Sequence, residues 1–227
     1  MNHSADGRYI WQHEDLQVHL LKEKAIWLEE EKSLLVSDTH FGKAGHFRKS
    51  GIPIPETIHI NDYHKIYQLI STLGAQKVYF LGDLFHSDHN ETWADLLEFL
   101  DENPTVNFHL VLGNHDILPA EIYQSSRLQI HKQACIMGRF VLSHEPLKQV
   151  AEGKLNICGH LHPGLVIKGK SKQFLKLPCY YYTRNCLIMP AFGNFTGLMK
   201  MSAKTAEAIL VTTAEAVIPI KLKNKVG

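Results

Sequence analysis

Short apolar runs, rich in β-branched and aromatic residues, alternate with turn residues along most of the chain. Runs of this length and composition predict β-strands. The predicted strands are Val18–Leu21, Ala25–Leu28, Leu34–Ser37, Val78–Leu81, Phe108–Leu112, Phe140–Ser143, Leu155–Cys158, Cys186–Met189, Ala208–Thr212 and Val217–Leu222. No repeat, low-complexity tract or Pro/Ser-rich linker interrupts the pattern, so we expect a single domain over residues 1–227.

Two segments have apolar residues at helical spacing instead. The first runs from about Pro55 to Leu73 and is followed by Gly74, which suits the C-terminal cap of a helix. The second runs from about Glu91 to Leu100 and carries its apolar residues on one face. This mixture of strands and helices predicts a layered α/β or α+β domain.

Polar residues of a restricted kind follow five of the predicted strands directly. They are Asp38-Thr39-His40, Gly82-Asp83, Gly113-Asn114-His115-Asp116, His144, and Gly159-His160-Leu161-His162. Each residue alone could be a strand-end turn residue, because Asp and Asn are favoured in turns. In an open α/β sheet, however, the carboxyl ends of the strands form the crevice where ligands bind. We therefore expect seven of these side chains to converge: Asp38, His40, Asp83, Asn114, His144, His160 and His162.

The chemistry of these side chains favours divalent cations. Carboxylate, imidazole and amide groups without cysteine suit Mn²⁺, Fe or Zn²⁺. Seven ligands are too many for one ion that keeps an open position, but they fit two ions that share a carboxylate. Two ions about 3.5–4 Å apart can stabilise both the attacking and the leaving oxygen in a displacement at phosphorus.

Composition narrows the class of protein only a little. The 227 residues are 44% hydrophobic and 21% charged, which is typical of a soluble globular protein. No apolar run approaches the roughly 20 residues of a membrane span, and the N-terminus lacks the apolar core of a signal peptide. Four widely spaced cysteines predict reduced thiols and a cytoplasmic protein. The net charge of +1 neither favours nor excludes nucleic acid.

The ordered series D-x-H, G-D, G-N-H-D, H and G-H-x-H resembles the motifs of the calcineurin-like metallophosphoesterases over about Leu34–Pro163. The resemblance implies a four-layer sandwich in which helices flank two mixed β-sheets, with a two-metal centre in the motif loops. It implies one metal on Asp38, His40 and His162, a second on Asn114, His144 and His160, and Asp83 as the bridge between them. It also implies that His115 protonates the leaving oxygen or stabilises the transition state, and that Asp116 orients His115.

Residues outside these motifs resemble a narrower group, the bacterial ligase-associated DNA-damage-response phosphoesterases. They are His40-Phe41-Gly42-Lys43, Phe47-Arg48, Gly51-Ile52-Pro53, Leu177-Pro178-Cys179 and the segment Leu187–Gly197. This resemblance implies a phosphodiesterase or endonuclease that works in DNA repair with a DNA ligase, a helicase and an exonuclease. DNA or RNA would then be the substrate, with no membrane partner.

Basic residues near the motifs are candidates for binding substrate. The segment Lys168–Lys176 carries four lysines, of which we expect Lys168 and Lys170 to contact phosphate groups. A solvated hairpin or a mobile loop is the alternative for this segment. Arg48 is a candidate for bidentate phosphate binding, and His86 is a candidate for lining the cleft.

The aromatic run Tyr180-Tyr181-Tyr182, followed by Arg184, suggests two uses. The rings could stack on bases or cap the cleft. They could equally be strand residues that alternate between the protein and solvent.

The leading functional hypothesis is a metal-dependent phosphodiesterase, either a nuclease or a hydrolase of nucleotide-like diesters. The alternatives are a phosphomonoesterase with the same two-metal centre and a non-catalytic scaffold of the same fold. The intact Gly113-Asn114-His115-Asp116 motif counts against a scaffold, because a scaffold has no need of His115.

Overall fold

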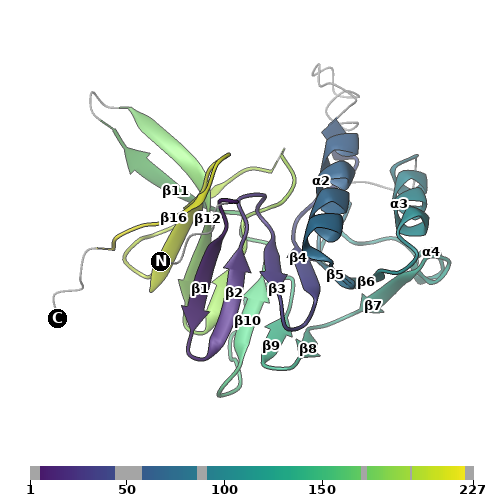
Figure 1. Cartoon of the computed structure of the whole chain (residues 1–227), viewed down its shortest axis with the longest axis horizontal. Helices are drawn as coiled ribbons and strands as arrows, with labels where there is room; N and C mark the ends of the chain where they lie inside the picture. The colour runs from purple at the N-terminus through teal and green to yellow at the C-terminus, as the bar shows by residue number, and fades with distance from the viewer. Residues whose placement is uncertain (1–5, 44–57, 86–90, 170–172, 195, 223–227) are drawn as a thin grey trace.

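The fold is built on two mixed β-sheets that pack face to face (Figure 1). A computed structural model describes residues 6–43, 58–85, 91–169, 173–194 and 196–222. The first sheet has the strand order β1-β2-β3-β4-β5-β6-β7, antiparallel from β1 to β4 and parallel from β4 to β7. Its strands are β1 (Tyr9–His13), β2 (Leu16–Leu20), β3 (Ile26–Leu28), β4 (Ser33–Val36), β5 (Lys77–Leu81), β6 (Asn107–Val111) and β7 (Leu128–His131).

The second sheet has the order β14-β11-β12-β13-β10-β9-β8, with β15 and β16 joined to it through β12. Its parallel centre consists of β9, β10 and β13. Its strands are β8 (Cys135–Met137), β9 (Phe140–Leu142), β10 (Leu155–Cys158), β11 (Pro163–Lys168), β12 (Phe174–Thr183), β13 (Cys186–Ile188), β14 (Met199–Lys200), β15 (Ala208–Thr212) and β16 (Val217–Pro219).

A continuous apolar core fills the space between the sheets. Alternate residues of the first sheet, such as Leu35 and Leu81, pack against residues of the second sheet, such as Leu142, Ile157 and Leu187. All five are fully buried. Burying side chains of this size stabilises the fold by about 1.5–3 kcal/mol each. This core fixes the two sheets to each other, and with them the ends of their strands.

The three helices among the described residues all pack on the outer face of the first sheet (Figure 1). They are α2 (Ile58–Leu73), α3 (Glu91–Glu102) and the short α4 (Ala120–Gln124). The fold class expected from the sequence is confirmed, with one difference in detail. In the described part of the chain, coil around Met201 and Ile220 covers the outer face of the second sheet in place of helices. None of the described helices is long and apolar enough to cross a membrane.

The predicted elements agree closely with the observed ones. Each of the ten predicted strands is present with its ends shifted by at most two residues, except that the last ends early, at Pro219. The sequence pattern missed β1, β7, β8, β11, β12, β14 and α4. Most of these are edge strands or very short elements, in which few residues are buried and the periodicity is therefore weak.

The tyrosine run lies on a strand, as the second interpretation predicted, but none of its rings faces solvent, and the prediction that they stack on bases or cap the cleft was wrong. Tyr180, Tyr181 and Tyr182 are buried near the C-terminal end of β12, at 0%, 2% and 8% exposure. The hydroxyl of Tyr180 lies 2.7 Å from the carbonyl oxygen of Leu21, and that of Tyr181 lies 2.8 Å from the carbonyl oxygen of Ser202. Both faces of this strand are covered, so three consecutive rings can be core residues with satisfied hydroxyl groups.

Candidate metal centre

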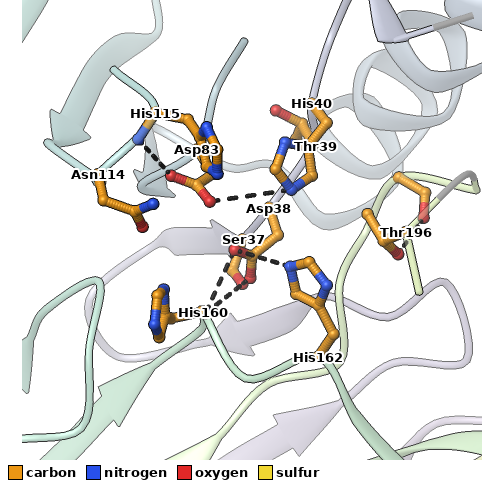
Figure 2. A network of polar contacts seen from close by, with 12 residues as sticks. Ser37, Asp38, Thr39, His40, Asp83, Asn114, His115, His160, His162 and Thr196 are labelled. Carbon is orange, nitrogen blue, oxygen red and sulfur yellow. Dashed lines mark hydrogen bonds and ion pairs between the residues drawn. The ribbon is translucent and has the colours of Figure 1, made fainter. Parts of the chain in front are cut away.

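Strand ends from both sheets meet at one place, and they carry the seven side chains expected from the sequence. Asp38, Asp83 and Asn114 follow the neighbouring parallel strands β4, β5 and β6 of the first sheet. His144 follows β9 of the second sheet, while His160 and His162 follow β10. Hydrogen bonds join the loops, including one from the backbone N–H of His160 to the Asp38 carboxylate at 3.0 Å (Figure 2).

The first group of candidate ligands consists of Asp38, His40 and His162. One side-chain N or O atom from each lies within 4.8 Å of those of the other two, a spacing that could hold a metal ion. Asp38 is fully buried, and its Oδ1 lies 3.3 Å from Nε2 of His162. The rings of His40 and His162 meet edge to face, with centroids 5.5 Å apart. The site therefore gathers one carboxylate and two imidazoles with little access to water.

The second group consists of Asp83, His144 and His160, with Asn114 at its edge. One side-chain N or O atom from each of the first three again lies within 4.8 Å of the others. Nε2 of His144 lies 3.0 Å from Nδ1 of His160, 3.0 Å from Oδ1 of Asn114 and 3.4 Å from Oδ1 of Asp83. Four polar groups therefore converge on one small space.

The protonation of His144 shows that this convergence suits a cation. Nδ1 of His144 lies 2.9 Å from the carbonyl oxygen of Leu81, which can only accept a hydrogen bond. In the neutral ring the proton is then on Nδ1, and Nε2 presents a lone pair. Near that lone pair lie the oxygen atoms of Asn114 and Asp83, which are acceptors as well, and Nδ1 of His160, which can either donate to it or present a lone pair of its own. A cation bound among these atoms would accept their lone pairs and so remove the repulsion between them.

Asp83 lies between the two groups. Its Oδ2 is 3.9 Å from Nε2 of His40, in the first group, and its Oδ1 is 3.4 Å from Nε2 of His144, in the second group. The carboxylate thus turns one oxygen toward each group. This is the geometry that a bridging carboxylate needs, and it matches the division of ligands that the resemblance implies.

Charge is concentrated at Asp38. Burial by itself would raise the pKa of its carboxyl group. When His162 and His144 are protonated, the hydrogen bond and charge of His162, the Ser37 hydroxyl and the charge of His144 outweigh burial and hold this pKa below its ordinary value. Asp38 is therefore an anion at neutral pH, as a metal ligand must be.

Two aspartates, Asp83 and Asp116, position the loop that carries Asn114 and His115 by accepting hydrogen bonds from the backbone. The backbone N–H of His115 donates to Oδ1 of Asp83 at 3.0 Å. The Asp116 carboxylate accepts from the backbone N–H groups of Gly113 at 2.8 Å and Leu84 at 2.9 Å. Burial raises the pKa of Asp116, although these two hydrogen bonds oppose the shift. Asp116 thus positions the loop, and its expected contact with the His115 ring stays a prediction.

His115 itself is exposed, as is Asn114 beside it, whereas the ligands Asp38, His40, Asp83 and His144 are buried. Its ring meets that of His40 edge to face, with centroids 5.9 Å apart, so it lies beside the first group (Figure 2). An imidazole at the solvent edge of a cation site can reach a bound substrate without binding an ion itself.

The glycines that directly precede Asp83, Asn114 and His160 have a steric role, which Gly159 shows best. A Cβ atom on Gly159 would lie 2.0 Å from Oγ of Ser37 and 2.4 Å from Oδ2 of Asp38. Only glycine lets the backbone of His160 approach the Asp38 carboxylate closely enough to donate to it. The sequence shows the glycine, but the closeness of the two loops is visible only in the fold.

The residues predicted to bind substrate are placed only in part. Arg48, His86 and Lys170 lie outside the described residues. Lys168 is the last residue of β11, which forms a hairpin with β12. This agrees with the alternative of a solvated hairpin. Lys43, noted from the sequence only as part of a basic stretch, is half-buried and interacts electrostatically with both Asp83 and Asp38. Burial lowers the pKa of Lys43, while these two carboxylates oppose that shift.

Several groups that orient the ligands were not predicted. They are the Ser37 hydroxyl on Asp38, the Leu81 carbonyl on His144 and the Gly197 carbonyl on His162. Two of the three are backbone atoms, whose role depends on tertiary position and leaves no trace in residue identity. Ser37 precedes a ligand directly, so it was the one that the sequence could have suggested.

Comparison with known proteins identifies the family. The family model for calcineurin-like phosphoesterases matches residues 32–185, and the chain belongs to that family. The fold is similar to the crystal structure of Pseudomonas putida nuclease MPE, with a TM-score of 0.75 and 24% sequence identity. That alignment covers 94% of this chain and 100% of the other.

Two further solved structures are more distant. YfcE, a phosphoesterase from E. coli, has a TM-score of 0.46 and 13% identity over 84% of this chain and 99% of its own. A predicted phosphoesterase from Streptococcus pneumoniae has a TM-score of 0.36 and 10% identity over 83% and 95%. No curated protein sequence gives a significant match. The family and the two candidate ion sites together identify the protein as a metal-dependent phosphoesterase.

Proposed function

We propose that the protein is a phosphodiesterase that hydrolyses nucleic acid with two divalent ions, Mn²⁺ being the preferred metal. The observation that carries the proposal is the position of Asp83, with one carboxylate oxygen turned toward each group of ligands. Shared in this way, seven oxygen and nitrogen ligands suffice for two ions and leave positions open for a phosphate group. The donor set contains no cysteine, which favours Mn²⁺ over softer metals.

When bound, the two ions would supply hydroxide near neutral pH and neutralise charge on the phosphoryl oxygens. The protein's own residues do the rest. Asp38 and Asp83 keep the centre anionic, and the loop held by Asp116 places His115 at its open edge. From there His115 donates a proton to the leaving oxygen as the ester bond breaks. Lys43 adds a positive charge beside both carboxylates, where it can attract a phosphodiester.

The hairpin of β11 and β12 supports a polymeric substrate, and we name it the arm. It starts at Pro163, directly after the ligand His162, and its far end projects from the body of the molecule (Figure 1). Lys168 and Phe174 are cross-strand partners, and the ammonium group lies 5.9 Å from the centre of the ring. Phe174 is 64% exposed. A lysine beside an open aromatic face suits the phosphate and base of a single strand.

Lys176 connects the arm to the residues that support His162. Residues two apart on a strand share a face, so Lys176 lies on the same face as Phe174. The ammonium of Lys176 donates to the carbonyl of Leu198, the residue after Gly197, and the Gly197 carbonyl faces His162. A nucleic-acid strand bound between the two groups of ligands could therefore continue onto Lys168 and Phe174.

The remaining parts of the proposal follow from similarity. The solved structure with the TM-score of 0.75 is called a nuclease. The resemblance seen in the sequence adds work in DNA repair beside a DNA ligase and a helicase, in the cytoplasm and as a single domain.

A paired assay tests the proposed reaction. The Mn²⁺-loaded protein is given an aryl phosphodiester and the matching monoester, and kcat/KM is measured for each, with Asp83→Asn as the control for contaminating activity. We expect at least a tenfold preference for the diester and no turnover of either substrate by Asp83→Asn. A preference for the monoester would overturn the proposal in favour of a phosphomonoesterase. Turnover of neither substrate would leave a scaffold as the better account.

A further inference from the structure

Residues 192–194 and 196–199 contact the first group of ligands through their backbone. The backbone N–H of Phe192 donates to the carbonyl of Ser37 at 2.8 Å, and that of Gly193 donates to the carbonyl of Asp38 at 3.3 Å. The backbone N–H of Met199 donates to the carbonyl of His162 at 2.9 Å. The segment thus holds the main chain of two ligands that lie far apart in the sequence.

The same segment also sets the ring of His162. Nδ1 of His162 lies 3.2 Å from the carbonyl oxygen of Gly197, which can only accept a hydrogen bond. The proton of the neutral ring is therefore on Nδ1, and Nε2 presents its lone pair to the centre, 3.3 Å from Oδ1 of Asp38. A hydrogen bond of this kind orients a ligand histidine and raises its basicity.

Gly193 is the point where the segment is most tightly held. Its carbonyl oxygen accepts from Nζ of Lys24 at 3.3 Å and from Oγ1 of Thr196 at 3.1 Å. A Cβ atom at Gly193 would lie 2.4 Å from the carbonyl oxygen of Thr39, so no larger residue fits without moving the loop of Asp38. In Figure 2, Thr196 appears on the side of the site where His162 lies, opposite Asn114.

Lys24 reaches this position from the far end of the sequence, 169 residues before Gly193. Burial lowers the pKa of Lys24 to about 8, the charge of Lys65 lowers it further and Asp62 opposes the shift. The ammonium form still predominates at neutral pH. Asp62 is buried and also accepts from Nδ2 of Asn194 at 3.4 Å, so the lysine and the segment share this anion.

The second group of ligands is oriented differently. His144 donates to the carbonyl of Leu81, the last residue of β5, and Asp83 follows that same strand. None of the described hydrogen bonds joins residues 192–194 or 196–199 to Asp83, His144 or His160. These residues therefore contact the first group of ligands directly and reach the second only indirectly, through bonds such as that from the backbone N–H of His160 to the Asp38 carboxylate.

We propose that Lys24 and residues 192–194 and 196–199 form a positioning device for only one of the two ions, the one held by Asp38, His40 and His162. Lys24 and Thr196 fix the carbonyl of Gly193, and through it the main chain of Asp38 and the ring of His162. The device sets the affinity of this ion without touching its neighbour. This inference depends on the proposed function in one respect, which is that two ions bind.

Titration calorimetry of the metal-free protein with Mn²⁺ tests the proposal. The wild type should bind two ions per chain. In Lys24→Met and in the milder Thr196→Val, we expect one dissociation constant to rise by about 10-fold to 100-fold, as for other changes behind metal ligands, and the other to stay unchanged. Lys22→Met is the matched control, and circular dichroism checks that each variant is folded.

A double variant identifies the affected ion. His162→Ala should leave a single ion, and adding Lys24→Met to it should then change nothing, since both changes act on the same site. A further loss of affinity in the double variant, or equal weakening of both ions in Lys24→Met, would overturn the proposal. Unchanged binding in both Lys24→Met and Thr196→Val would do the same. Failure of the wild type to bind any ion would instead overturn the proposed function, and this inference with it.

Discussion

Five of the seven candidate ligands have a backbone conformation that ordinary residues avoid. Asp38, His40, Asp83, His160 and His162 have φ between +45° and +66°, in the left-handed region. Each such residue costs on the order of 1–3 kcal/mol, and the surrounding structure must supply that energy. The strain is concentrated where the side chains must converge, so we infer that it is maintained for the sake of the site.

His115 is the residue whose substitution separates catalysis from metal binding. It is exposed and belongs to neither group of ligands, so His115→Ala should leave folding and metal binding intact. We expect kcat on a phosphodiester to fall by about 100-fold to 10,000-fold, the usual contribution of a positioned acid. Steady-state kinetics with Mn²⁺, together with the metal content of the purified variant, measure this.

The matched control for that experiment is His64→Ala, which removes an exposed histidine on α2. It should behave as the wild type does. Equal turnover by His115→Ala and the wild type would remove His115 from the mechanism, and loss of metal from His115→Ala would make it a ligand instead.

The seven candidate ligands could be found from the sequence because they follow strands that have a clear apolar pattern. The pattern could not predict the groups that hold these ligands in place. Carbonyl groups such as those of Leu81 and Gly197 act through their position alone. The motif Phe192-Gly193-Asn194 was visible as a resemblance but had no function until the fold placed it behind Asp38.

At the scale of elements, the sequence predicted buried strands well and exposed ones poorly. The strand β10 is buried at every residue and was predicted with its exact ends. The strand β12 begins with exposed residues and ends with buried ones, so neither an alternating pattern nor a continuous apolar run describes it. The same mixture explains why the tyrosines of β12 were misplaced: their burial comes from covering segments that are distant in the sequence.

The arm formed by β11 and β12 has a testable role of its own. Phe174→Ser removes its stacking surface, and Lys168→Gln removes its positive charge. We expect each change to raise KM for a single-stranded oligonucleotide by about 5-fold to 100-fold, since stacking on one base contributes about 1–3 kcal/mol. KM for a small aryl diester should not change, because that substrate does not extend beyond the metal centre.

Ile136→Ser is the control for the arm, since Ile136 is 68% exposed on β8, at the opposite edge of the same sheet. Oligonucleotide kinetics at several salt concentrations complete the measurement: Lys168→Gln should make KM less dependent on salt. If Phe174→Ser raises KM equally for the oligonucleotide and for the aryl diester, the arm affects the metal centre itself and is not a binding surface.

At the scale of the whole molecule, the site exists because two sheets are packed with their strand ends together. The ligands of the first group come from both sheets, with Asp38 and His40 after β4 and His162 after β10. The second group is divided in the same way, since Asp83 follows β5 while His144 and His160 follow β9 and β10. The apolar core between the sheets therefore controls the geometry of both ion sites.

The central claim is that Asp83 bridges two ions in one centre, and electron paramagnetic resonance of the Mn²⁺-loaded protein tests it most directly. Ions about 3.5–4 Å apart interact magnetically. We predict two Mn²⁺ per chain with the multiline spectrum of a coupled pair, and in Asp83→Asn the loss of that coupling. A spectrum of isolated Mn²⁺ at full occupancy, or a single ion per chain, would contradict the account.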